Sequence, residues 1–139
     1  MSLDQAPYYA LLYYTLSHPD PAFIHQNAVD AYAAQHAEEN SKPIAVAFAL
    51  IGLYLYVEKG FSGRQVQQRH MQLAKRRKQW PAFALPPQRG TVTISDVLAA
   101  PAGEKRDQMI REWCFSVWSA WSDARDRVIE LLESEPNLV

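Results

Sequence analysis

Apolar positions along the chain recur at intervals of three and four residues, whereas the strict alternation that is typical of strands is almost absent. Such spacing places apolar side chains on one face of an α-helix. Residues 104–133 show it most clearly, and we expect them to form one long helix at the centre of the core. Its apolar face, with Cys114 beside it, carries Ile110, Trp113, Val117, Trp121, Ala124, Val128 and Leu131.

Prolines, glycines and capping residues divide the rest of the chain into further helices. These are expected from Pro7 to about His18, from Asp20-Pro21 to about Glu38, from Ser41 to Gly60, and from Ser62 to a point before Pro81.

A loop rich in proline is expected at residues 80–94, packed on the helices through Trp80, Phe83 and Leu85. Residues 91–95 alternate like a strand but have no partner strand, so they should lead into a short helix capped by Ser95 or Asp96. The fold class that follows is all-α: a compact bundle of about five helices, with residues 1–139 forming a single domain.

Composition and charge narrow the function classes. The 139 residues are 48% apolar, the net charge is −1, and the chain has one cysteine. With one cysteine, the chain can form no intrachain disulfide and no zinc site built from several cysteines. Its nearly balanced net charge gives no overall electrostatic attraction to nucleic acid. The longest apolar run, residues 43–57, is shorter than the roughly 20 residues of a membrane-spanning helix. We therefore expect a cytoplasmic protein without a membrane or nucleic-acid partner.

The stretch HQNAVDAYAAQH, residues 25–36, is the first candidate for chemistry. His25 and His36 fall on one helix face but lie some 16 Å apart at ~1.5 Å per residue. One helix therefore cannot bring both to the same ion. A divalent metal would need ligands from elsewhere, and His18 and His70 are the candidates. The alternative is that these histidines are half-buried and hydrogen-bonded to backbone or carboxylate groups.

Asp30 lies on a different side of the same helix, among alanines that favour close approach of a neighbouring helix. A buried carboxylate needs hydrogen-bond donors, and Arg111, Arg106 or the Trp113 indole could supply them. Asp30 is then either a brace between helices or a catalytic acid. Cys114, which stands among apolar residues, is expected to be a buried, unreactive thiol.

Two surfaces could bind partners. The first is a basic segment without acidic residues, made of Arg64, Arg69, Lys75, Arg76, Arg77 and Lys78. These residues spread around the helix and gather at its C-terminal end, which favours a solvated helix end over a phosphate-binding surface. The second is the N-terminal helix, whose tyrosines lie on more than one face, so that some could line a homodimer or adaptor interface: Tyr8, Tyr9, Tyr13 and Tyr14.

Several segments resemble, in order over residues 8–125, a family of uncharacterised bacterial proteins, DUF5946. They are HPDPAFIHQNAVDAYAAQH, KPIAVAFALIGLYLYVEKGFSGRQVQ, ISDVLAAP and WCFSVWSAW. The resemblance implies a shared fold and a shared motif, and it names no reaction. The motif residues in this chain are His25, Asp30, Tyr32, Gln35 and His36.

Two hypotheses of different class follow. In the first, the protein binds a metal or an unidentified small ligand beside the helix of residues 25–36, with or without enzymatic activity. In the second, it is a non-catalytic interaction module that uses its aromatic helix surfaces.

Overall fold

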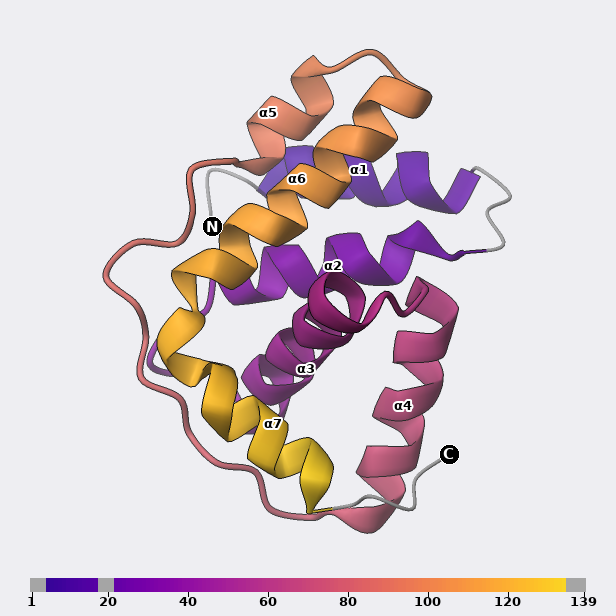
Figure 1. Ribbon diagram of the computed structural model, residues 1–139. Helices are drawn as coiled ribbons and strands as arrows, with labels where there is room; N and C mark the ends of the chain where they lie inside the picture. Colours follow the sequence, from indigo (N-terminus) through magenta and orange to yellow (C-terminus); the bar gives the residue numbers. More distant parts are fainter. Residues whose placement is uncertain (1–4, 18–21, 135–139) are drawn as a thin grey trace.

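The structure is a computed structural model that describes residues 5–17 and 22–134 (Figure 1). Within these ranges it holds seven α-helices, one 3-10 helix and no strand, so the all-α expectation is confirmed. The elements are α1 (Gln5–Ser17), α2 (Ile24–Gln35), α3 (Pro43–Lys59), α4 (Gly63–Arg76), α5 (Ile94–Ala99), α6 (Glu104–Ala120), η1 (Ser122–Ala124) and α7 (Arg125–Glu133).

The described residues hold seven α-helices where about five were expected, and division of the expected helix over residues 104–133 accounts for one of the additional helices. α6 ends at Ala120, η1 follows, and α7 begins at Arg125. Ser122 and Asp123, at the break, are weak helix formers because their side chains compete for backbone hydrogen bonds. The expected apolar face is nevertheless correct: all seven of its residues and Cys114 are buried. The break changes the direction of the chain and lets α6 pack on α2 while α7 packs on α3 (Figure 1).

Several expected helix ends are confirmed by their caps. Gly60 follows α3 with a positive φ of 71°, and Ser62 forms a capping box with Gln65 at the start of α4. The expected cap of α5 was wrong. Thr93 caps that helix and Asp96 completes the box from its third position.

The helix that carries the motif also differs from its expected bounds. α2 ends at Gln35, with His36 as the C-terminal cap, instead of near Glu38. Its expected start at Asp20-Pro21 lies outside the described residues, as does His18.

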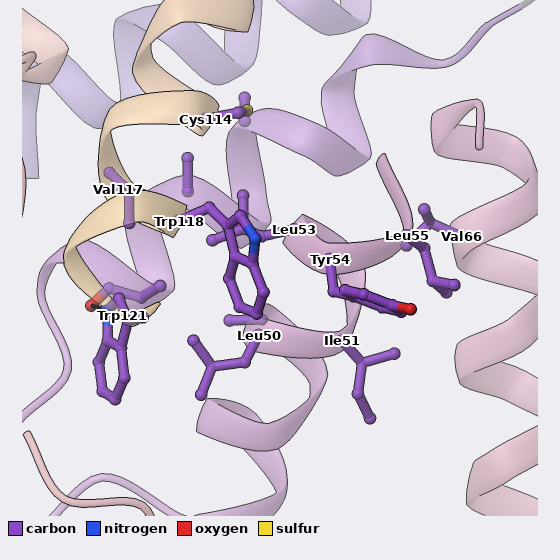
Figure 2. Close-up of a cluster of buried hydrophobic side chains, with 14 of the residues drawn as sticks. Leu50, Ile51, Leu53, Tyr54, Leu55, Val66, Cys114, Val117, Trp118 and Trp121 are labelled. Carbon is purple, nitrogen blue, oxygen red and sulfur yellow. Dashed lines mark hydrogen bonds between the residues drawn. The ribbon is translucent and has the colours of Figure 1, made fainter. Parts of the chain in front are cut away.

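α3 lies at the centre of the fold, and α2, α4, α6 and α7 all contact it. Nine of its 17 residues are buried. Figure 2 shows Leu50, Leu53 and Tyr54 of this helix beside Trp118 and Val117 of α6. The high apolar content of α3 therefore reflects burial on several sides. Among the described residues, no helix is both long enough and apolar enough to span a membrane.

The loop between α4 and α5 runs along one edge of the molecule (Figure 1). Residues 77–93 hold no helix or strand. Trp80, Phe83 and Leu85 are partly buried against the core, as expected. The loop is therefore packed on the bundle and fixed to it by the hydrogen bonds described below.

Candidate functional site

The motif helix α2 lies between α1, α3, α4 and α6, so most of its polar side chains meet a neighbouring helix. His25 is half-buried, and its Nδ1 lies 2.9 Å from Oγ1 of Thr15 in α1. The Thr15 hydroxyl donates its single proton to the Leu12 carbonyl. The Nδ1–H of His25 therefore donates to Thr15. Burial lowers the pKa of His25, so the neutral ring is favoured.

Three stacked rings form the second contact between α1 and α2. The Tyr32 ring lies 3.7 Å from the Tyr8 ring at 7°, and 4.1 Å from the His36 ring at 25°. His36 also donates from Nδ1 to the Tyr32 carbonyl at 3.0 Å. Burial raises the pKa of Tyr8. His25 and His36 thus contact different groups, in agreement with the distance between them on the helix.

Gln35 connects α2 to the long loop and to α6. Its side-chain oxygen accepts from the Trp113 indole at 2.9 Å, and its amide donates to the carbonyls of Val92 at 2.8 Å and Arg89 at 3.3 Å. Both N–H donors and the oxygen of this amide therefore have partners within the fold.

Arg89, in the same loop, closes the end of α2. Its guanidinium donates to the carbonyls of Ala37 at 2.8 Å and Gln35 at 3.3 Å. The Gln35 carbonyl is the last of α2 and the Ala37 carbonyl lies just beyond its cap, so no following helical turn donates to them. A cation beside them also complements the helix dipole. The sequence analysis missed this residue, because no pattern connects a loop arginine to a helix more than 50 positions earlier.

Asp30 is the most deeply buried titratable residue of the motif, with 3% of its surface exposed. The Gln26 amide donates to Oδ1 at 3.1 Å, while Oδ2 is buried without a hydrogen-bond partner among the described residues. Burial raises the pKa of Asp30 well above its usual value, so the neutral carboxyl is favoured.

The donors expected for Asp30 were wrong. Arg106 donates to the carbonyls of Ala100 and Leu98, and the Trp113 indole donates to Gln35. Arg111 is exposed on α6.

Gly52 of α3 packs directly against Asp30. A Cβ atom at position 52 would overlap Oδ2 of Asp30 and come within 3.2 Å of Val66 in α4. α3 is thus the helix that approaches this side of α2 closely, as expected. The approach is possible because position 52 has no side chain. The geometry is that of a brace between helices.

His70 is buried on the inner side of α4. Its Nε2–H donates to the Phe48 carbonyl at 2.8 Å, and its ring stacks on the Phe48 ring at 4.5 Å and 2°. Burial lowers the pKa of His70 to about 4. Within residues 5–17 and 22–134, no three His, Cys, Asp or Glu side chains are arranged to hold a metal ion. A metal site shared by His25, His70 and His18 stays a prediction, because His18 lies outside these ranges.

The side chains of the basic segment have different surroundings. Arg64 lies over the Phe23 ring at 4.4 Å, and Arg77 over the Trp80 ring at 5.5 Å. Lys75, Arg76 and Lys78 are exposed. Arg77 and Lys78 also lie beyond the end of α4. This spread is typical of a solvated helix end.

Cys114 is fully buried, as expected, and burial raises its pKa. Its thiol donates to the Asn27 carbonyl at 3.5 Å. The neutral thiol is a poor nucleophile.

Among the described helices, α1 exposes the most large apolar side chains, since α4 and α6 each expose only one. Tyr14 points inward, donating to Asp107 at 2.8 Å and accepting from the Gly103 N–H at 3.0 Å. Tyr9, Tyr13 and Leu16 are instead mostly exposed. The expectation that the tyrosines lie on more than one face of this helix is confirmed.

Comparison of the sequence with known proteins identifies the family of the chain. The family model described as a family of unknown function, DUF5946, matches residues 5–122. No significant match was found among curated proteins or among solved structures. The match includes α1 to α6 and every motif residue. The chain therefore belongs to the DUF5946 family, whose function is unknown.

Proposed function

We propose that the protein is a self-associating helical module in which the outer face of α1 packs against the same face of a second copy. One observation carries this proposal: Tyr9, Tyr13 and Leu16 are exposed by 60%, 77% and 62%. They occupy positions i, i+4 and i+7 and form one stripe along the helix. A surface helix normally turns polar side chains to solvent. An aromatic stripe there is typical of an interface.

The charge of α1 favours a second copy as the partner. The helix, QAPYYALLYYTLS, has no charged residue. A two-fold symmetric interface places each surface against itself, so a charged surface would repel its copy unless the charges were arranged to pair. An uncharged stripe meets no such repulsion. It also offers nothing to a partner that is recognised by charge.

The size of the stripe indicates weak association. At roughly 200 Å² for a whole aromatic side chain, Tyr9 and Tyr13 together expose about 270 Å². A standard interface buries about 800 Å² on each partner. The two rings and Leu16 would form the centre of such an interface, while the surrounding surface supplies the rest. We therefore expect a dimer that dissociates on dilution.

The motif residues of α2 support this role by holding α1 in place. His25 binds Thr15 and Tyr32 stacks on Tyr8, and both partners lie on α1. These contacts fix the inner side of a helix whose outer side faces solvent. In this proposal His25 and Tyr32 are positioning residues for the interface. A metal or small ligand beside α2 stays a prediction as the alternative function.

Sedimentation velocity across a wide concentration range tests the proposal. We expect wild-type protein to pass from monomer to dimer as its concentration rises, and the variant Tyr13→Glu to remain monomeric. The control is Phe115→Glu on α6, since Phe115 is exposed by 59% and the substitution adds the same charge.

Two outcomes would overturn the proposal. One is a wild-type protein that stays monomeric up to millimolar concentration. The other is loss of the dimer in Phe115→Glu together with its retention in Tyr13→Glu. Circular dichroism of each variant ensures that the comparison is made between folded proteins.

A further inference from the structure

We infer that the groove between α3, α4 and α7 binds a small organic acid that has one carboxylate and an apolar body. The groove has a volume of about 350 Å³, which lies at the lower end of the range for small-molecule sites. Five apolar and three charged residues line it: Tyr54, Leu55, Phe61, Ile129, Leu132, Lys59, Arg69 and Glu133. No residue of α1 or of the α2 motif takes part, so the inference is independent of the proposed self-association.

The apolar lining determines the body of the ligand. Tyr54 and Leu55 are nearly buried on α3, and Figure 2 shows them directed toward the α4 side of the core. Leu132, also nearly buried, and Ile129 line the groove from α7. A phenyl ring or a short alkyl chain in the groove would release water from Phe61 and Ile129, which are only partly buried.

The charges at the groove determine the head group. Lys59 and Arg69 are positive and Glu133 is negative, so the lining has an excess of one positive charge. Lys59 extends over the Tyr54 ring, with Nζ 5.9 Å from its centre. A single carboxylate matches this excess, whereas a polyphosphate would bring more negative charge than the lining can balance.

A nearby ion pair keeps another carboxylate from competing for Lys59. Glu58 accepts from Arg125 at 2.7 Å and 2.9 Å, and also from the Trp118 indole at 2.7 Å. The hydrogen bonds from Arg125 are the main reason that the pKa of Glu58 is lowered. Both oxygens of Glu58 are thus engaged by Arg125 and Trp118, and no ion pair joins Lys59 to another side chain of the described residues.

Two probes of matched shape test the inference: 4-phenylbutyrate and 4-phenylbutanol, titrated into the full-length protein by isothermal calorimetry. The acid and the alcohol share a phenylpropyl group and have the same number of carbon atoms, and only the acid is charged. We expect the acid to bind at least tenfold more tightly than the alcohol. Arg69→Gln or Lys59→Gln should weaken binding of the acid about tenfold and leave the alcohol unchanged. Lys75→Gln, an exposed residue of the same helix as Arg69, is the control and should change neither.

The variant Ile129→Trp tests the location, because the larger side chain fills the groove. It should abolish binding of both probes while the protein keeps its helical circular dichroism. Equal affinity for the two probes, no binding of either at millimolar concentration, or unchanged binding in Ile129→Trp would each overturn the inference. Monomer and dimer should bind the acid alike, so failure of the self-association proposal can be distinguished from failure of this one.

Discussion

Two helices each bury one titratable side chain against α3, and they do so in different ways. α2 places Asp30 against Gly52, and α4 places His70 against Phe48, one helical turn earlier on α3. His70 has a hydrogen-bonded ring nitrogen and a stacked ring, whereas one carboxyl oxygen of Asp30 has no partner among the described residues.

The common feature of the two contacts is the uncharged form of the buried group. Burial raises the pKa of Asp30 and lowers that of His70, because each move keeps charge out of the interior. The two groups therefore respond to pH in opposite directions. Asp30 favours folding in acid, and His70 favours it near neutrality.

The largest effect is expected for Gly52→Ala. The added methyl group would overlap the Asp30 carboxyl, and α2 would have to move away from α3. We expect the free energy of unfolding to fall by about 3 kcal/mol or more, at the upper end for an overpacked core. Urea denaturation measures it.

A double-mutant cycle identifies the cause of that loss. Asp30→Ala removes the carboxyl, so Gly52→Ala should be much less destabilising in the Asp30→Ala background. Additive effects of the two substitutions would show that the contact between positions 30 and 52 is not responsible.

The next largest effect is a pH-dependent difference in unfolding free energy between the wild type and Asp30→Asn. An unfolded chain releases the Asp30 proton near pH 4, while the folded chain holds it to higher pH, so wild-type stability falls as pH rises through this interval. Relative to Asp30→Asn, which does not titrate, the wild type should lose about 1.4 kcal/mol per pH unit above pH 4 until the folded protein releases its proton. Urea denaturation at pH 4, 5 and 6 gives the difference. A constant difference would mean that Asp30 is ionised in the fold.

His70 should show the opposite sign. The unfolded chain binds a proton below about pH 6.5, but the folded chain does so only near pH 4, so stability is present above pH 6.5 and is lost as pH falls. The loss should approach about 3 kcal/mol at pH 4. His70→Phe keeps an aromatic ring beside Phe48 and cannot titrate. Its stability should therefore lack this acid-dependent loss, and an unchanged acid profile would place the titration elsewhere.

The smallest effect is expected for Phe48→Leu. The ring stacks on His70 and meets the edge of Trp80 at 5.1 Å. Each aromatic pair adds about 1 kcal/mol beyond the area that it buries, and leucine keeps most of that area. We expect thermal unfolding to report a loss of about 2 kcal/mol. If Phe48→Leu left the stability unchanged, the stacked ring would contribute nothing, and the hydrogen bond of His70 alone would hold its side chain in place.

Most of the fold could be predicted from local signals. Helix caps such as Gly60 and Ser62 determine where the adjoining helix ends or begins. The apolar face of residues 110–131 follows from the regular spacing of a helix. The break at Ser122 was missed because the apolar spacing continues across it. Such spacing shows which side is buried and says little about whether the axis stays straight.

The candidate site was harder to predict because its contacts join distant segments. Gln26 precedes Asp30 by four residues, a spacing that allows a side-chain hydrogen bond, so this donor could have been found. Gly52, the one glycine within residues 43–57, was a second signal. The partners of His25 and Gln35 lie on other elements, and no sequence spacing predicts them.

The anchoring of α2 by Arg89 has a consequence for synthesis of the chain. Ala37 and Arg89, joined by a hydrogen bond, are 52 positions apart. The ribosome therefore releases the whole of α2, α3 and α4 before the arginine that closes the end of α2. Until then the carbonyls of Gln35 and Ala37 lack the hydrogen bonds that the Arg89 guanidinium donates. The nascent helix gains its permanent C-terminal end when the loop arrives, which makes docking of the loop a late step of folding.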